Sequence, residues 1–175
     1  MSSGISIFSW NCQGCANEKF PRSFREYIRE HKPNIVSLLE PRVSGRKADE
    51  VIAKIGLQYS HRVEARGFSG RIWLSWNSSL NLEILINHPQ FILTRVSYGV
   101  PTQTILIIFV YRSPNRTKRT FLWEALEESL QPTSPGWQLV ILTPSCLNMK
   151  RKEDHLKGNV ALFWEASLII TIYTI

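Results

Sequence analysis

The stretch 103–111, QTILIIFVY, is the strongest strand pattern in the chain, because β-branched and aromatic residues run through it unbroken. Towards the N-terminus, four shorter strand-like segments precede it, at 59–63, 71–76, 82–86 and 91–97. Towards the C-terminus, apolar residues at helical spacing predict a helix over 116–130, followed by a strand at 138–142. The predicted core face of that helix consists of Phe121, Leu122, Ala125, Leu126 and Leu130.

The first third of the chain alternates strands and helices. A strand is predicted over 5–10, where apolar and polar residues alternate, and a second over the apolar run 35–39. Helices are predicted over 17–31 and over 47–55, the latter stopped by Gly56. The resulting order is neither a strict alternation of strand and helix nor all-β. It predicts one α+β domain in which packed sheets carry helices on their outer faces.

The composition is that of a globular chain with one unusual feature. Of the 175 residues, 43% are hydrophobic and 20% are charged, which allows a sizeable core and does not suggest disorder. Lys and Arg outnumber Asp and Glu by 21 to 14, so the formal net charge is +7. A basic surface favours polyanions such as nucleic acids. A basic protein with no polyanion partner has the same composition, so charge alone does not choose between them.

The three cysteines are too few and too unevenly placed for a disulfide framework. Cys12 and Cys15 have the CxxC spacing of a redox pair or of half a zinc site. A zinc site needs two more thiol or imidazole ligands, and the sequence contains no second CxxC and no HxxxH. A redox pair would be expected to open a helix in a thioredoxin-like unit, whereas this pair follows a predicted strand. The spacing is therefore interpreted as coincidental.

Two polar side chains stand at the ends of predicted strands. Asn11 follows the first strand and Glu40 follows the second. Strand ends are where open sheets gather ligands, so the two side chains can converge on one ion. Their oxygen donors suit Mg²⁺, which binds few protein carboxylates and keeps water for a phosphate substrate. Considered singly, each residue favours a plainer interpretation, in which Asn11 caps a turn and Glu40 is a solvated strand end.

Four segments taken in order make the pattern more specific. They are SWNCQG (9–14), LLEPRVSG (38–45), GFSGRIWLSWNSS (67–79) and VYRSPNRTKRTFLWEAL (110–126). Over residues 5–142 they resemble successive landmarks of the endonuclease/exonuclease/phosphatase (DNase I-like) domain of plant LINE-type non-LTR retrotransposons. The resemblance implies a four-layer αββα sandwich of two mixed sheets that nicks DNA by metal-assisted phosphodiester hydrolysis.

The resemblance also implies a cofactor, a partner and a location. Mg²⁺ or Mn²⁺ is the implied metal and DNA the implied partner, with no small-molecule cofactor and no membrane. A nuclear location follows from the DNA substrate alone. The N-terminal sequence lacks a basic segment and a long apolar run, so no secretory signal is predicted.

Four residues match functional positions of the family. Asn11 resembles the asparagine near the metal and the scissile phosphate, and Glu40 resembles the principal metal-binding glutamate. Tyr111 resembles the tyrosine that helps to hold the phosphate. Arg42 stands where the family often has a basic residue that could meet the DNA backbone, although a solvated arginine fits the sequence as well. The tryptophans of the third segment resemble core aromatics and are assigned to packing.

Two family motifs are missing. After the strand at 138–142, where the family has Gly-Asp-Phe-Asn, Thr143 stands in the aspartate position and Ser145 in the asparagine position. A hydroxyl cannot supply the charge of a carboxylate, and losing such a group typically costs on the order of 10²–10³ in rate. The family's late Ser-Asp-His motif, which handles the proton of the attacking water, is absent. Asp154 and His155 are adjacent, so in an extended segment they would point opposite ways.

The last residues are also unlike the family. Residues 160–175, VALFWEASLIITIYTI, are too short for a membrane span and are predicted to be a strand-prone apolar tail after a partial endonuclease-like domain, 1–159. We expect the sandwich to be incomplete at its C-terminal end, with an open sheet edge. A truncated and decayed retroelement copy would explain these losses together. Three functions remain open: an inactive endonuclease-derived domain, a non-catalytic basic nucleic-acid-binding remnant, and a phosphodiesterase or phosphatase with a rearranged site.

Overall fold

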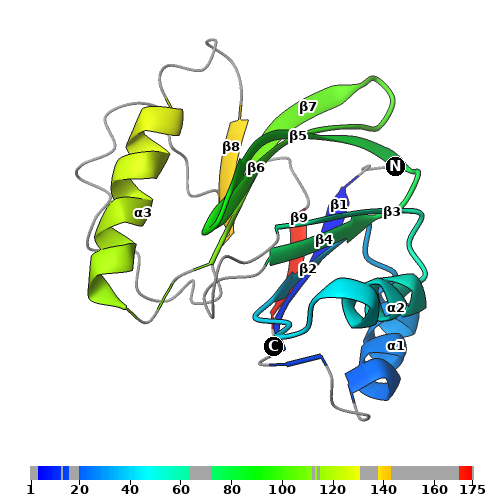
Figure 1. The fold of residues 1–175 in the computed structure, drawn as a ribbon. Helices are drawn as coiled ribbons and strands as arrows, with labels where there is room; N and C mark the ends of the chain where they lie inside the picture. The colour runs from blue at the N-terminus through cyan, green and yellow to red at the C-terminus, as the bar shows by residue number, and fades with distance from the viewer. Residues whose placement is uncertain are drawn as a thin grey trace.

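The computed structural model describes residues 4–12, 14–15, 20–63, 72–111, 113, 115–130, 138–142 and 170–174. They form two mixed sheets flanked by helices (Figure 1). The first sheet has the order β3-β4-β2-β1-β9, and its strands are β1 (Ile5–Asn11), β2 (Ile35–Leu39), β3 (Tyr59–Arg62), β4 (Ile72–Trp76) and β9 (Ile170–Thr174). The second sheet consists, in order, of β5 (Leu80–His88), β6 (Phe91–Tyr98), β7 (Gln103–Val110) and β8 (Gln138–Leu142). The helices are α1 (Phe20–His31), α2 (Gly45–Ile55) and α3 (Arg116–Ser129).

Three apolar clusters separate these elements into layers. The largest cluster lies between the two sheets and includes Ile7 and Ile107. A second cluster, which includes Phe8 and Phe24, lies between the first sheet and helices α1 and α2. The third lies between the second sheet and α3, around Leu126. The layers are therefore α1 with α2, the first sheet, the second sheet and α3 (Figure 1), which confirms the predicted αββα sandwich.

Strand β7 lies between two apolar layers, which explains its unbroken apolar sequence. Ile105, Ile107 and Phe109 belong to the cluster between the sheets, whereas Leu106 and Ile108 belong to the cluster under α3. Successive side chains of a strand point to opposite faces. A strand that is covered on both faces must therefore be apolar at nearly every position.

One predicted helix face is wrong. Phe121 was expected on the core face of α3 but is 60% exposed, whereas Leu122 and Leu126 are each 1% exposed. Leu126 marks the middle of the buried face, and Phe121 precedes it by five residues, which places it about 140° around the helix. The other helices follow the prediction more closely. The predicted stop at Gly56 is confirmed, since this residue caps α2 with φ 75, a conformation that suits glycine.

Part of the apolar tail joins the first sheet. Strand β9 runs parallel to β1, with Ile170 opposite Ile5 and Thr174 opposite Ser9. Residues 170–174 of the predicted strand-prone tail therefore do form a strand, which lies at the edge of the sheet beside β1. The predicted end of the endonuclease-like domain at residue 159 stays a prediction. Thr143, Ser145 and the 154–155 pair lie outside the described residues. No described helix is long and apolar enough to cross a membrane.

Candidate functional site

The ends of β1 and β2 meet at one edge of the first sheet. The two strands are parallel, and Asn11 is opposite Leu39, the residue before Glu40. The backbone N–H of Cys12 donates to the carbonyl oxygen of Leu39 at 3.0 Å, which continues the contact beyond the strands. Asn11 is half-buried. By the alternation of β1 it lies on the same side as Ile7, which packs between the sheets.

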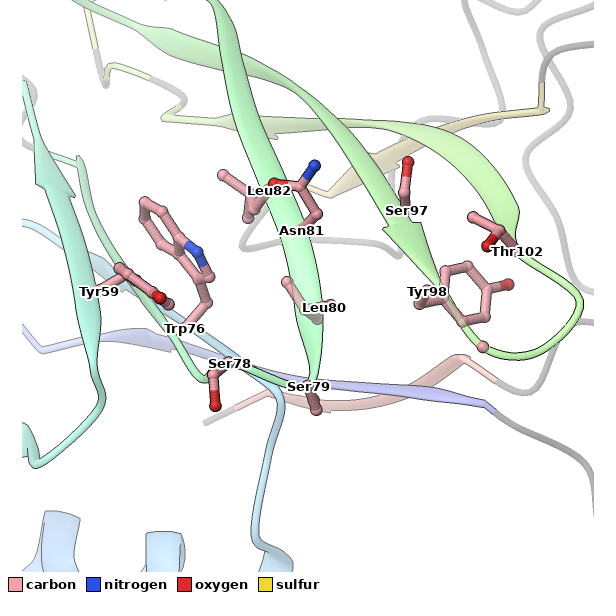
Figure 2. A pocket seen from close by; sticks show the side chains of 11 residues that line it. Tyr59, Trp76, Ser78, Ser79, Leu80, Asn81, Leu82, Ser97, Tyr98 and Thr102 are labelled. Atoms are coloured by element: carbon pink, nitrogen blue, oxygen red, sulfur yellow. The ribbon is translucent and has the colours of Figure 1, made fainter.

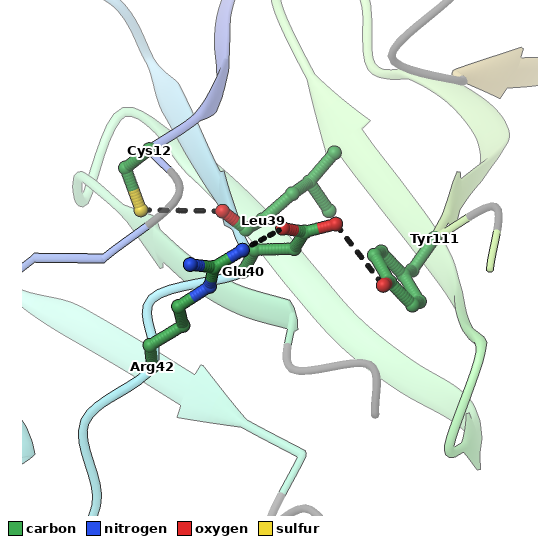
Figure 3. Close-up of polar contacts among 5 residues, drawn as sticks. All are labelled: Cys12, Leu39, Glu40, Arg42 and Tyr111. Atoms are coloured by element: carbon green, nitrogen blue, oxygen red, sulfur yellow. Dashed lines mark hydrogen bonds and ion pairs between the residues drawn. The ribbon is translucent and has the colours of Figure 1, made fainter. Parts of the chain in front are cut away.

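The end of β7 brings a residue of the second sheet to the same place. Tyr111 directly follows β7 and is 6% exposed. Its backbone N–H donates to the carbonyl oxygen of Gln90 at 2.7 Å, which holds the chain beside the turn before β6. Its hydroxyl donates to Oε1 of Glu40 at 3.0 Å (Figure 3). Two residues 71 positions apart, each of which follows an inner strand of its own sheet, are therefore in direct contact.

The segment that carries Glu40 has an unusual backbone. Glu40 and Arg42 have φ values of 52 and 53, and Pro41 lies between them. Left-handed geometry costs a residue with a side chain about 1–2 kcal/mol. Such strain persists only where the surroundings enforce it, and it concentrates at functional sites. The described part of the chain has one other non-glycine residue with positive φ, Lys32, so two such residues are gathered on either side of Pro41.

Glu40 bridges a buried donor and an exposed one. Oε2 of Glu40 accepts from Nη2 of Arg42 at 3.3 Å, and the Arg42 side chain is 65% exposed (Figure 3). So exposed an ion pair adds little to stability, but it leaves the guanidinium accessible to an anion. Burial, and then the hydrogen bond to Glu40, raise the pKa of Tyr111 to about 12. The phenol therefore remains a hydrogen-bond donor at neutral pH.

Two thiols lie against the Glu40 segment. The sulfur atoms of Cys12 and Cys15 are 2.9 Å apart. Sγ of Cys12 also donates to the carbonyl oxygen of Leu39 at 3.2 Å, as Figure 3 shows. The N–H of Cys15 donates to the carbonyl oxygen of Pro41 at 2.7 Å. The hydrogen bond from Cys15 lowers the pKa of Cys12, while the same contact and burial raise the pKa of Cys15. The interpretation of CxxC as coincidental spacing missed this contact, although the spacing itself was the available signal.

The donors at this edge fit a weakly held hard cation. Among the described residues, no group of three or more His, Cys, Asp or Glu could hold a metal ion. The oxygen donors at the two strand ends are the amide of Asn11 and the carboxylate of Glu40, whose oxygens accept from Tyr111 and Arg42. Mg²⁺ commonly binds through one or two carboxylates and completes its shell with water and substrate phosphates. Oxygen donors of this kind suit Mg²⁺ or Mn²⁺ held in that mode, whereas a structural zinc ion would need four protein ligands.

Some of the basic side chains are already paired with carboxylates. Nη1 of Arg62 is 2.5 Å from Oδ1 of Asp49, and Nε of Arg46 is 3.3 Å from Oε1 of Glu50. The first turn of α3, like that of α2, contains basic residues and no acidic residue. This turn begins five residues after Tyr111. Positive charge at a helix N-terminus adds to the positive end of the helix dipole, which favours anions.

A separate hollow lies at the opposite end of the sandwich. It has a volume of about 660 Å³ and is lined in part by Tyr59, Trp76 and Tyr98 (Figure 2). The rings of Tyr59 and Trp76 stack with centroids 5.9 Å apart. Trp76 is opposite Ile35 at the start of β2, whereas Glu40 follows the end of β2. The hollow therefore lies away from the strand ends that carry Asn11 and Glu40.

Comparison with solved structures identifies the fold. The crystal structure of D. rerio TDP2 complexed with single strand DNA product has a TM-score of 0.56 and 13% identity over 79% of this chain and 59% of that chain. A humanized D. rerio TDP2 gives 0.53 and 12% identity, over 77% of this chain and 59% of that chain. AP endonuclease LMAP from Leishmania major gives 0.50 and 16% identity, over 70% of this chain and 45% of that chain. The sequence matches no family model and no curated protein.

These likenesses establish a DNase I-like α+β sandwich, the fold of endonucleases and phosphatases that includes TDP2 and AP endonucleases. The chain spans 59% of D. rerio TDP2 and 45% of the Leishmania enzyme. Identities this low identify the fold and not the reaction.

Proposed function

We propose that this chain is a domain derived from a divalent-metal-dependent DNA endonuclease of the LINE retroelement type, which binds Mg²⁺ and DNA but by itself does not hydrolyse phosphodiester bonds efficiently. The observation that carries the proposal is the hydrogen bond between Tyr111 and Glu40. It joins the two sheets at the edge where both strand ends carry polar residues. The strained backbone of Glu40 and Arg42 lies at the same point.

In the proposed site each residue has a defined task. Glu40, together with the amide of Asn11, would hold the metal, and the metal would supply positive charge beside a scissile phosphate. Tyr111 donates its one hydroxyl proton to a carboxylate oxygen of Glu40 and so orients that carboxylate; to bind a phosphate oxygen, the hydroxyl would exchange this bond for one to the phosphate. Arg42 offers an exposed guanidinium, whose planar donors suit a phosphate.

The weak activity in this proposal follows from the sequence. Thr143 and Ser145 stand where the resemblance places an aspartate and an asparagine, and no Ser-Asp-His follows. Groups that act together on one water lose their effect together, so restoring some of them recovers little. We expect Thr143→Asp with Ser145→Asn to leave nicking at the level of the parent chain. Full activity in this double variant would show that the late histidine is not needed.

The second candidate is a metal-free nucleic-acid-binding domain, favoured by the net charge of +7 and by the basic first turn of α3. A third is a competent phosphodiesterase with a rearranged site.

The electron spin resonance signal of Mn²⁺ measures whether the chain binds the ion. This measurement separates the proposed metal-binding domain from the metal-free nucleic-acid-binding domain. The proposal predicts Mn²⁺ binding that Glu40→Gln weakens at least about tenfold, equivalent to roughly 1.4 kcal/mol. If the chain is instead a metal-free nucleic-acid-binding domain, it should bind DNA, and Glu40→Gln should leave that affinity unchanged.

A matched control and a nicking assay complete the experiment. Glu83→Gln also removes an arginine-paired carboxylate, but on β5, and it should leave Mn²⁺ affinity unchanged. Supercoiled plasmid is then incubated with each chain in Mg²⁺ or in chelator. The proposal predicts no nicking above the chelator background. Rapid nicking that Glu40→Gln abolishes would support the third candidate, and nicking that survives Glu40→Gln would show that the metal assignment is wrong.

A further inference from the structure

We propose that Cys12 and Cys15 form a reversible disulfide in the folded chain, with Cys12 as the sulfur that reacts first with an external disulfide. This inference does not depend on the proposed function. It rests on the contact of 2.9 Å between the two sulfur atoms. A disulfide bond is about 2.0 Å long, so the sulfurs need to approach by only about 1 Å.

The fold holds both cysteines in position through the neighbouring strand end. The N–H of Cys12 donates to the carbonyl oxygen of Leu39 at 3.0 Å, and the N–H of Cys15 donates to that of Pro41 at 2.7 Å. Gly14, between them, has φ 120, which a residue with a side chain rarely adopts. The turn that brings the sulfurs together is thus anchored at both ends. In the unfolded chain these anchors are absent, and closing the ring must restrict the backbone.

Exposure assigns the two sulfurs different tasks. Cys12 is partly exposed and packs against the cluster between α1, α2 and the first sheet, whereas Cys15 is 2% exposed and belongs to that cluster. We therefore expect an external disulfide to meet Cys12 before Cys15. Cys15 is positioned to resolve the intermediate, because its nearest sulfur is that of Cys12.

With oxidised glutathione as the co-reactant, the exchange balances. The sulfur of Cys12 attacks one glutathione sulfur, forms a mixed disulfide and releases the first glutathione, which takes up the proton that Cys12 lost. The sulfur of Cys15 then attacks the sulfur of Cys12 and releases the second glutathione with the proton of Cys15. Two protein thiols are oxidised to one disulfide, and one glutathione disulfide is reduced to two thiols.

The equilibrium test compares the folded chain with the same chain unfolded in urea. The protein carries Cys146→Ser so that only the pair can react. Both samples equilibrate in a series of reduced and oxidised glutathione mixtures, are quenched in acid and alkylated, and are read by mass spectrometry of the peptide containing residues 12–15. We expect the ratio of disulfide to dithiol to be at least about tenfold higher in the folded chain. Equal ratios in the two samples, or mixed disulfides alone, would overturn the proposal.

Two single variants test the order of attack. Cys15→Ser should accumulate a glutathione adduct on Cys12, because the resolving sulfur is gone. Cys12→Ser should form an adduct at least about tenfold more slowly, because Cys15 is buried. Equal rates in two folded variants, checked by circular dichroism, would overturn the assignment of Cys12 as the first sulfur. The comparison of folded and unfolded chain stands even if a variant fails to fold.

Discussion

Tyr111 and Tyr98 present the same phenol in two different situations. Both belong to the cluster between the sheets, and both are 6% exposed. The hydroxyl of Tyr111 donates to the carboxylate of Glu40. The buried hydroxyl of Tyr98 has no hydrogen-bond partner within the described part of the chain. The pair therefore separates the effect of a hydroxyl from the effect of its hydrogen bond.

We expect Tyr111→Phe to lower the free energy of unfolding by about 1.5 kcal/mol, the usual size of a hydrogen bond to a charged group. Tyr98→Phe should change it by less than about 0.5 kcal/mol, or raise it, because a buried hydroxyl without a partner carries a desolvation cost. Urea unfolding followed by tryptophan fluorescence measures both. Equal losses in the two variants would mean that the Tyr111–Glu40 bond adds nothing to the folded state.

His88 is a residue whose protonation should oppose folding. Its ring stacks on Phe91 with centroids 4.5 Å apart, and its Nδ1 accepts from the backbone N–H of Gln90 at 3.2 Å. Burial lowers the pKa of His88 below the usual 6.5. An accepting nitrogen at this position must be unprotonated, which agrees with that direction.

The pH dependence follows from this direction. The unfolded chain takes up the His88 proton near pH 6.5, and the folded chain does so only at lower pH. The contribution to stability is therefore complete above pH 6.5 and is lost as the pH falls through the folded pKa. Urea unfolding at pH 7.5 and pH 5 should show a smaller loss for His88→Gln than for the parent chain. A loss of the same size in both chains would show that His88 does not titrate differently in the two states.

At the scale of elements, α3 shows how a helix is attached to a sheet. Leu122 and Leu126 fill the cluster on the second sheet, and Asn115 caps the helix by accepting the N–H of Lys118 at 3.2 Å. Phe121 is in the same helix but faces away from the sheet. The packing of α3 on the second sheet therefore depends on the narrow helix face that carries Leu122 and Leu126. The size of a side chain alone does not predict whether it contributes to this packing.

Truncation of two apolar residues of α3 should affect stability to very different extents. Leu126→Ala should lower the free energy of unfolding by about 2–5 kcal/mol, because it leaves a cavity in the cluster. Phe121→Ala should change it by less than about 0.5 kcal/mol, although it removes more atoms. Thermal or urea unfolding of the two variants checks this. A large loss for Phe121→Ala would mean that this ring is covered in solution.

For the molecule as a whole, the pairing of β1 with β9 extends the first sheet by one strand, so that β1 is paired on both sides. Parallel pairing joins residues far apart in the sequence, from Ile5 opposite Ile170 to Ser9 opposite Thr174. Without β9, the N–H and C=O groups of β1 on that side would lose their partners. An unpaired strand edge is a template for pairing with another chain.

Deletion of residues 170–175 should therefore destabilise the fold and promote self-association. We expect the free energy of unfolding to fall by roughly 2–5 kcal/mol, on the scale of several backbone hydrogen bonds. Sedimentation at increasing concentration should reveal larger species. A chain that lacks only residue 175 is the control and should remain like the parent. Unchanged stability and unchanged sedimentation after the longer deletion would show that β9 does not pair with β1 in solution.

The sequence by itself determined the elements and their layers, because strand and helix periodicities are local. The strands over 35–39 and 138–142 and the stop at Gly56 agree with the structure for that reason. The unbroken apolar run of β7 likewise indicated a strand, although its double burial became clear only with α3 and the opposite sheet in place. Local patterns could also indicate that Asn11 and Glu40 follow strands, but not whether the two strand ends meet.

Only the tertiary structure decided what those residues touch. Three features depend on segments that are distant in the chain. They are the contact of Tyr111 with Glu40, the left-handed backbone at Glu40 and Arg42, and the pairing of β9 with β1. The approach of Cys12 to Cys15 is close in sequence, yet it depends on two carbonyl groups of another strand end. Such contacts arise when packing brings whole elements together, and no local period of the sequence encodes them.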